Sequence, residues 1–185
     1  PARVTGLGLR DTRAVLLPTW HLEPRQMWWY KLFMFAGSTK WQSDDVLYMD
    51  LDTIIVDSVE KFYDYQSGKF CICQDFNRAF IREYPISNSS VIRFNPKEHT
   101  DIYDYFTENM PNIFRNYRGD QDYITWWFKE RKLYWWPREW AMSYKWELKH
   151  GGTKHGGPSI NYPQDYLQPD VYDVLHHNCY IALFH

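Results

Sequence analysis

Two aspartates, Asp50 and Asp52, lie between the apolar runs 46–49 and 53–56. A charge beside buried apolar strands is costly unless it is paired or bound to a metal. In an extended chain, residues two apart point to the same side, so we expect both carboxylates to reach one cation. Clustered carboxylate oxygens suit Mg²⁺ or Mn²⁺ better than zinc. The alternative is a simple turn, where aspartate is common.

A lysine interrupts the apolar segment that precedes these aspartates. Pro24 suits the first turn of a helix, and segment 28–35 continues it to a stop at Gly37. Its apolar residues occur almost all round, which predicts a buried helix. Lys31 is the cation in this run, and it either extends to solvent or reaches toward a phosphate.

Small polar residues introduce a later strand. Asn88 and Ser89 precede the strand-like run 91–94, which Pro96 ends. Polar side chains at the mouth of a buried strand are candidates for binding a ligand.

An acidic cluster and a histidine complete the candidate residues. Asp120, Gln121 and Asp122 open an apolar helical segment, where aspartate also favours the helix N-terminus without any chemistry. His185 follows the strand-like run 180–184, and is either a metal ligand or incidental.

The elements around these residues alternate between strands and helices. This alternation predicts an α/β fold with a mixed, mostly parallel central sheet flanked by helices. The 185 residues suffice for one domain with a real core, so residues 1–185 are expected to form a single domain.

Composition excludes several classes of function. With 21 basic and 23 acidic residues, the net charge of −2 gives no reason to expect nucleic-acid binding. The sequence contains no apolar run long enough for a transmembrane helix. Three cysteines without metal-site spacing suit a reducing compartment, which predicts a cytoplasmic location. The aromatic fraction of 19% hints at carbohydrate handling, or at a small core packed with rings.

These motifs together resemble those of GT-A glycosyltransferases with a family-8-like layout, over a range from about residue 28 to residue 185. Segment 28–35 resembles the helix before the metal-binding strand of that family, and Asp50 and Asp52 resemble its DxD motif. Asn88 and Ser89 resemble the sugar-pocket segment. The cluster of Asp120, Gln121 and Asp122 resembles the segment that contacts the transferred sugar.

The resemblance implies transfer of a sugar from a nucleoside diphosphate sugar, most simply a UDP-sugar, to a glycan or other hydroxyl acceptor. It implies that Mn²⁺ or Mg²⁺ is held by Asp50, Asp52 and His185, and that Lys31 assists at the phosphates. Asn88 and Ser89 would contact the sugar. An inverting course needs Asp120 or Asp122 as base, whereas a retaining course places Gln121 near the anomeric carbon.

One departure and two alternatives accompany this resemblance. The family normally has a nucleotide-binding β-α-β unit before the position of residues 14–17, so the chain is either a fragment or recognises the base differently. The first alternative is a non-catalytic carbohydrate-binding module built on aromatic platforms. The second is a metal-dependent nucleotidyltransferase using Asp50 and Asp52, although the sequence has no Gly-rich phosphate loop.

Overall fold

The computed structural model describes residues 17–20, 22, 24–37, 45–76, 86–148 and 179–184. The helical elements in these ranges are η2 (Pro24–Phe35, a 3₁₀ helix), α1 (Lys61–Asp64), α2 (Thr100–Asn116), α3 (Asp120–Trp127), η4 (Arg138–Trp140, a 3₁₀ helix) and η5 (Tyr144–Leu148, a π-helix). The strands are β1 (Val46–Met49), β2 (Thr53–Ile55), β3 (Cys71–Gln74), β4 (Ser87–Phe94), β5 (Tyr134–Trp135), β6 (Ala141–Ser143) and β7 (Ile181–Leu183).

The described strands form two sheets. The larger sheet has the order β1-β4-β3-β5, and the smaller has the order β2-β7-β6. In the larger sheet, β4 pairs antiparallel with β1 and β3, and β3 pairs parallel with β5. In the smaller sheet, β7 pairs antiparallel with β2 and parallel with β6. Chain neighbours β1 and β2 therefore belong to different sheets.

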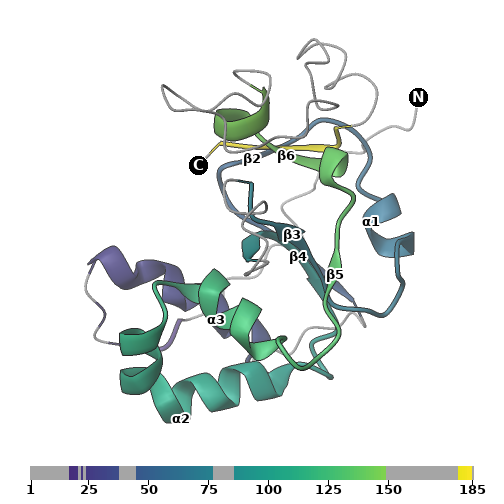
Figure 1. The fold of residues 1–185 in the computed structure, drawn as a ribbon. Coiled ribbons are helices and arrows are strands. Elements are labelled where there is room, and N and C mark those ends of the chain that lie inside the picture. The colour runs from purple at the N-terminus through teal and green to yellow at the C-terminus, as the bar shows by residue number, and fades with distance from the viewer. Residues whose placement is uncertain are drawn as a thin grey trace.

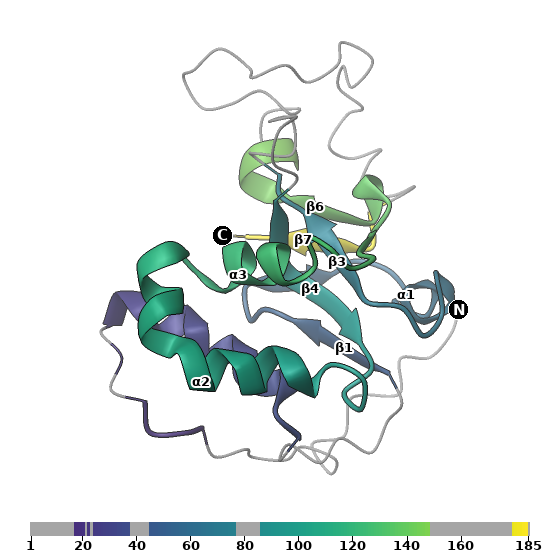
Figure 2. The ribbon, with the colours of Figure 1, turned by 60° about the horizontal axis from the view of Figure 1, so that its bottom comes forward.

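The larger sheet lies between two other layers. Helices η2, α2 and α3 cover one face, while α1 and the smaller sheet lie on the other side (Figures 1 and 2). Strand β4 is buried along its whole length, so both of its faces are covered by other parts of the fold. Because successive side chains alternate across a strand, Val91 joins the core toward the smaller sheet, whereas Ile92 joins the core toward the helices.

The 3₁₀ winding of η2 places every third residue on the same face of the helix. Residues three apart eclipse each other in a 3₁₀ helix. Trp29, Leu32 and Phe35 therefore share one face, and all three are buried in the core against α2, α3 and the larger sheet. Trp28 and Lys31 share a second face, outside this core. The sequence correctly predicted a helix that ends near Gly37, but its apolar residues gave no indication of the tighter winding.

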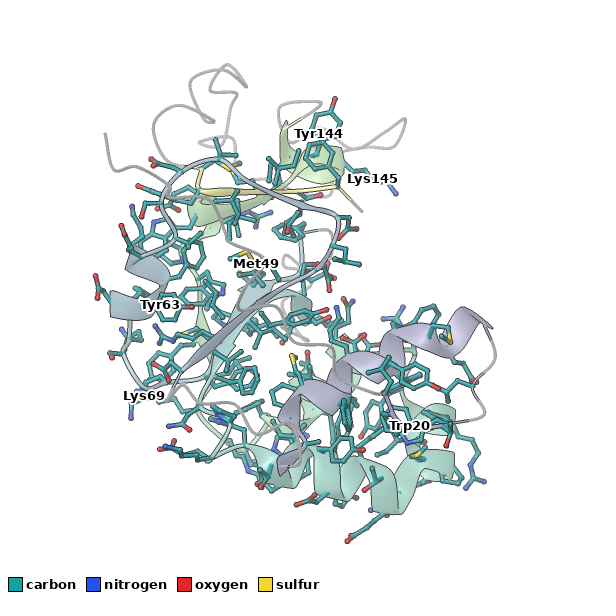
Figure 3. All side chains as sticks on the ribbon, turned by 180° about the vertical axis from the view of Figure 1, so that it is seen from behind. Trp20, Met49, Tyr63, Lys69, Tyr144 and Lys145 are labelled. Atoms are coloured by element: carbon teal, nitrogen blue, oxygen red, sulfur yellow. The ribbon has the colours of Figure 1, made fainter. Side chains whose placement is uncertain are left out.

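An aromatic stack holds the segment before η2 against the helices. Trp20 stacks on Tyr30, with the ring centroids 5.0 Å apart, and the Tyr30 hydroxyl donates to the Trp20 carbonyl at 2.8 Å. Figure 3 shows Trp20 on the helical side of the molecule. Much of the high aromatic content of the sequence is thus used in packing.

Helix α2 is kinked just before its internal proline. Asn109 leaves helical geometry, with φ of −123°, two residues before Pro111. Proline lacks an amide hydrogen and its ring crowds the preceding turn, which accounts for the kink. Buried Ile102, Phe106 and Ile113 lie on both sides of it, so the helix still covers the core as one unit.

The mixed α/β architecture with flanking helices is confirmed, whereas a mostly parallel sheet is wrong for the described strands. There, three of the five pairings are antiparallel. Apolar runs show where strands occur, but the partner and direction of each strand depend on tertiary pairing, which these runs do not encode.

In the described part of the chain, no helix combines the length and the apolar character needed to cross a membrane. The three cysteines are free and buried. The single domain and the cytoplasmic compartment stay predictions.

Candidate functional site

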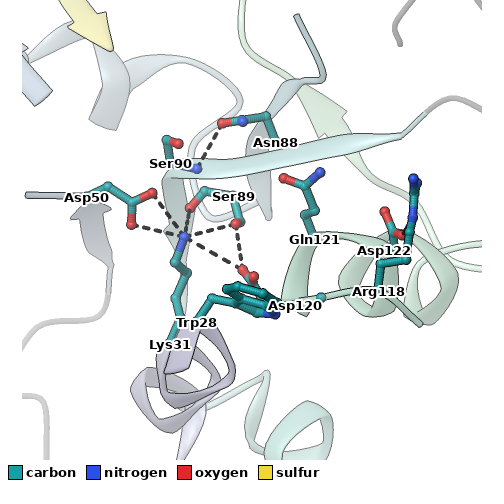
Figure 4. A pocket seen from close by; sticks show the side chains of 11 residues that line it. Trp28, Lys31, Asp50, Asn88, Ser89, Ser90, Arg118, Asp120, Gln121 and Asp122 are labelled. Carbon is teal, nitrogen blue, oxygen red and sulfur yellow. Dashed lines mark hydrogen bonds and ion pairs between the residues drawn. The ribbon is translucent and has the colours of Figure 1, made fainter. Parts of the chain in front are cut away.

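A cavity of about 430 Å³ opens where η2, the end of β1, the first half of β4 and the start of α3 meet (Figure 4). We call it the site cavity. Its lining comprises Trp28, Lys31, Asp50, Asn88, Ser89, Ser90, Arg118, Gly119, Asp120, Gln121 and Asp122. The residues predicted from the sequence that lie in this lining are Lys31, Asp50, Asn88, Ser89, Asp120, Gln121 and Asp122.

Lys31 lies at the centre of a polar network in this cavity. Its Nζ is 2.9 and 3.0 Å from the two carboxylate oxygens of Asp50, and it donates to Ser89 Oγ at 2.9 Å and to Ser89 O at 3.2 Å. Asp120 Oδ2 lies 3.6 Å away. The Lys31 side chain is only 12% exposed, so the alternative of extension to solvent is wrong. Because an ammonium group has three donor hydrogens, these acceptors satisfy it.

Asp50 is held rigidly at the end of β1. The Tyr48 hydroxyl donates to Asp50 Oδ1 at 2.7 Å, and Thr53 Oγ1 donates to the Asp50 carbonyl at 2.7 Å. The Asp50 amide donates to the Ser90 carbonyl at 2.9 Å. Burial, and then the negative charge of Asp50, raise the pKa of Tyr48, so its hydroxyl stays a donor. Tyr48 was missed by the sequence reasoning, although it lies in β1 only two residues before Asp50.

Asp120 is the buried carboxylate of the site. Ser89 Oγ donates to Asp120 Oδ2 at 2.5 Å, which links Asp120 to Lys31 through Ser89. Burial raises the pKa of Asp120, while Lys31 and Ser89 act in the opposite direction. The cap position of α3 is occupied by Gly119, and no side-chain bond caps the helix there. A purely structural capping role therefore does not account for Asp120.

The remaining predicted residues surround this network. Arg118 Nε lies 2.9 Å from Asp122 Oδ2, one helical turn away. Gln121 Nε2 is 3.5 Å from Oδ2 of the buried Asp75, at the far edge of the cavity. Asn88 Oδ1 accepts from the backbone amide of Ser90 at 3.0 Å, which orients its side-chain amide.

Asp52 lies outside the cavity lining. Residues 51 and 52 form a turn in which the chain passes from the larger sheet to the smaller one. The extended geometry expected for the Asp50–Asp52 pair is therefore wrong, and Asp52 is exposed. Its carbonyl accepts from the amide of Phe184 at 2.8 Å, so β7 ends beside this turn. The predicted ligand His185 lies outside the described residues.

A divalent metal fits this site only with ligands from a substrate. Among the described residues, no group of three His, Cys, Asp or Glu side chains is arranged to hold a metal. However, Mg²⁺ is commonly bound through one or two carboxylates together with substrate phosphates. Asp50 provides one such carboxylate inside the cavity, with acceptor capacity beyond its bonds to Lys31 and Tyr48, whereas Asp52 lies two residues on, exposed and outside the lining.

Trp28 and Gly119 form a wall of the cavity that sequence reasoning missed. A Cβ added to Gly119 would lie 3.0 Å from Trp28 Nε1, so the indole packs directly on the glycine. The available signal was the spacing of Trp28 and Lys31, which places both on one face of a 3₁₀ helix. Arg118, also missed, immediately precedes the predicted acidic cluster.

The described architecture is similar to that of solved glycosyltransferases. The galactosyltransferase LgtC, in complex with donor and acceptor sugar analogs, matches with a TM-score of 0.55 at 15% identity, over 84% of this chain and 57% of LgtC. The fold is that of a GT-A-like glycosyltransferase. An active site mutant of LgtC matches with a TM-score of 0.54 at 14% identity and the same coverage. The bifunctional glycosyltransferase WbbM, in its apo form, matches with a TM-score of 0.56 at 13% identity, over 84% of this chain and 30% of WbbM.

These likenesses concern the fold alone, because the sequence identities are only 13% to 15%. No family model and no curated protein matches the sequence. The chain spans a little over half the length of LgtC.

Proposed function

We propose that this chain is a metal-dependent glycosyltransferase that moves a sugar from a nucleoside diphosphate sugar to a hydroxyl group of a glycan or other acceptor. The observation that carries the proposal is the convergence of the predicted residues from η2, β1, β4 and α3 on one cavity. This convergence occurs in a fold shared with LgtC, whose structure was solved with donor and acceptor sugar analogs.

The donor diphosphate is proposed to lie at the Lys31 and Asp50 end of the site cavity. When bound, Mn²⁺ or Mg²⁺ held by Asp50 and Asp52, with His185, would offset charge growing on the leaving diphosphate. Lys31 already lies against Asp50 with its ammonium group inside the cavity. If the Lys31 ammonium group moved one of its hydrogen bonds from Asp50 to a phosphate oxygen, it would place a second positive charge, besides that of the metal ion, at the leaving diphosphate.

The sugar and the acceptor hydroxyl are proposed to lie toward Asn88, Ser89 and the start of α3. For an inverting course, Asp120 is the better base, since burial raises its pKa whereas Asp122 is paired with Arg118. For a retaining course, Gln121 would lie beside the anomeric carbon. A glutamine is also the residue replaced in the active site mutant of LgtC. The anomeric configuration of the first product, read by NMR, decides between these courses.

Thermal denaturation with UDP, GDP and UDP-sugars, each with and without Mn²⁺, tests the donor site. A ligand at a hundred times its Kd stabilises the native state by about 2.7 kcal/mol. For a chain of this size, that raises Tm by roughly 5 to 10 °C. We expect such a shift with UDP and Mn²⁺ together, and a much smaller one with UDP alone.

Matched variants test whether the Mn²⁺-dependent rise in Tm comes from the proposed metal ligands. Asp50→Asn should abolish the Mn²⁺-dependent part of the shift, and Asp52→Asn should weaken it, because each removes a proposed metal ligand. Asp64→Asn is the control, since Asp64 lies exposed in α1, outside the cavity lining. A shift caused by oligosaccharides alone would instead support a carbohydrate-binding module, and a preference for nucleoside triphosphates would support a nucleotidyltransferase. An Asp50→Asn protein that responds like wild type would refute the proposed donor site.

A further inference from the structure

A second cavity of about 320 Å³ adjoins the site cavity. It is enclosed by the first half of η2, the last turn of α2 and the loop before α3. The two cavities share Trp28 and Arg118 in their linings, so a ligand extending past these side chains would occupy both.

The charges of the two cavities differ in sign. The site cavity is lined by three aspartates along with Lys31 and Arg118. The second cavity has Arg115 and Arg118 in its lining, together with aromatic and amide side chains and with no carboxylate among the described residues. Arg115 Nε donates to the Pro111 carbonyl at 3.2 Å, and Arg118 Nε donates to Asp122. Each of these bonds uses one of the five donor hydrogens of a guanidinium group.

The other side chains of the second cavity suit a sugar ring. The Trp28 side chain is 45% exposed and packs on Gly119, and Tyr117 packs beside Trp126 with their ring centroids 5.4 Å apart. Aromatic rings of this kind offer an apolar face to the C–H face of a sugar. The amides of Gln26 and Asn116 contribute hydrogen-bonding groups that match hydroxyls.

We propose that the second cavity is a subsite for an anionic sugar of the acceptor. The sugar bears a carboxylate or a phosphate, which pairs with Arg115 and Arg118, while its ring lies against Trp28. Arginine forms bidentate hydrogen bonds with both of these anions, so the structure recognises their shared chemistry. That the bound sugar belongs to an acceptor rests on the proposed function. The binding itself can be measured without any transfer reaction.

Three probes differ in the anionic group that they carry: maltose has none, the same disaccharide with one glucuronate in place of glucose has a carboxylate, and maltose 1-phosphate has a phosphate. Each is titrated into the full chain labelled with ¹⁵N at tryptophan, and the indole signals are followed by NMR. The Trp28 signal is assigned with Trp28→Phe. We expect a charged probe to move the Trp28 signal and to bind at least tenfold more tightly than maltose. The stronger of the two charged probes identifies the source as a uronate or a sugar phosphate.

Charge variants outside the proposed catalytic groups test the assignment. Arg115→Gln should weaken binding of the preferred probe by roughly tenfold, as expected for loss of one charge-assisted contact at a partly exposed site. Arg115→Lys, which keeps the charge, should restore part of the loss. Lys129→Gln removes the same charge from an exposed position after α3 that lies in neither lining, and should leave binding unchanged.

Equal binding of maltose and the charged probes would overturn the subsite, and so would equal losses in Arg115→Gln and Lys129→Gln. The sugar titration and the nucleotide experiment distinguish failure of the subsite from failure of the glycosyltransferase proposal. Binding of a charged probe through Arg115, in a protein that ignores nucleotides and Mn²⁺, would keep the subsite and remove the glycosyltransferase. A nucleotide response without probe binding would do the reverse.

Discussion

Replacing Lys31 with methionine should destabilise the protein in a pH-dependent way. The substitution keeps an unbranched side chain of similar length, but it removes the cation between Asp50 and Asp120. The side chains of Asp50 and Asp120 are 22% and 7% exposed, so Asp120 in particular becomes an uncompensated buried charge. Breaking a buried ion pair by removing one partner costs about 3 to 5 kcal/mol. We expect about 3 kcal/mol at pH 7, because Ser89 still donates to Asp120.

The pH dependence follows from the pKa of Asp120. Burial raises this pKa in the folded protein above the ordinary value that it has in the unfolded chain, and Lys31 opposes that rise. Without Lys31, the folded pKa moves higher still. The folded state then binds the proton more tightly than the unfolded chain, so stability falls as pH rises through the window between the two values. The cost of Lys31→Met should therefore be smaller at pH 5 than at pH 7.

Urea denaturation at pH 5 and pH 7 measures both effects. At pH 7 the loss corresponds to a lowering of Tm by roughly 6 to 12 °C for a chain of this length. Lys129→Met serves as the control for loss of one exposed positive charge. The double variant Lys31→Met with Asp120→Asn should recover much of the lost stability, since no buried charge then lacks a partner at that position. A cost below about 0.5 kcal/mol at pH 7, or an equal cost at both pH values, would refute this account of the network.

Two further predictions concern the cavity wall and the core. Gly119→Ala should shift the NMR signal of the Trp28 indole and weaken UDP-sugar binding, because the new methyl group would lie 3.0 Å from Trp28 Nε1. The free energy of unfolding should fall by only about 1 kcal/mol, since the indole is half exposed and can move. An unchanged Trp28 signal would contradict the packing. Arg93→Met should lower the free energy of unfolding by about 3 kcal/mol in chemical denaturation, because the buried guanidinium donates to several backbone carbonyls. These are the carbonyls of Phe62, Tyr63, Gln66 and Lys69. The UDP response of the folded protein should stay intact. Loss of the nucleotide response in folded Arg93→Met would contradict a purely structural role.

Sequence periodicity was sufficient to locate most of the elements that carry the site. The apolar runs predicted β1, β2 and β7 within a residue or two, and Pro24 and Gly37 bracketed η2. Charged or polar residues inside or beside such runs stand out, because burial without a partner is costly. Lys31 and Asp50 were found for that reason, whereas Asp120 was found as part of the acidic cluster that resembles the sugar-contacting segment of the family.

The sequence could not show how these elements are joined in space. Asp52 was expected beside Asp50 because residues two apart share one side of a strand, but the chain turns at residues 51 and 52 and enters another sheet. Strand direction and sheet membership depend on pairings between distant residues, which an apolar run does not specify. Trp28 and Arg118 were missed because each looks like an ordinary surface or core residue until η2 and α3 are placed side by side. The roles assigned to the cavity residues stay predictions.

The three-residue period of η2 makes the length of this segment critical for the site. In a helix with three residues per turn, each added or removed residue rotates everything beyond it by about 120°. A single insertion between Pro24 and Trp28 would turn Lys31 into the core position now held by Leu32, whereas a single deletion there would turn the core residue Trp29 toward the cavity. Substitutions on the outer face of η2 have no such effect. Length, more than composition, is therefore the property of this segment that the site depends on.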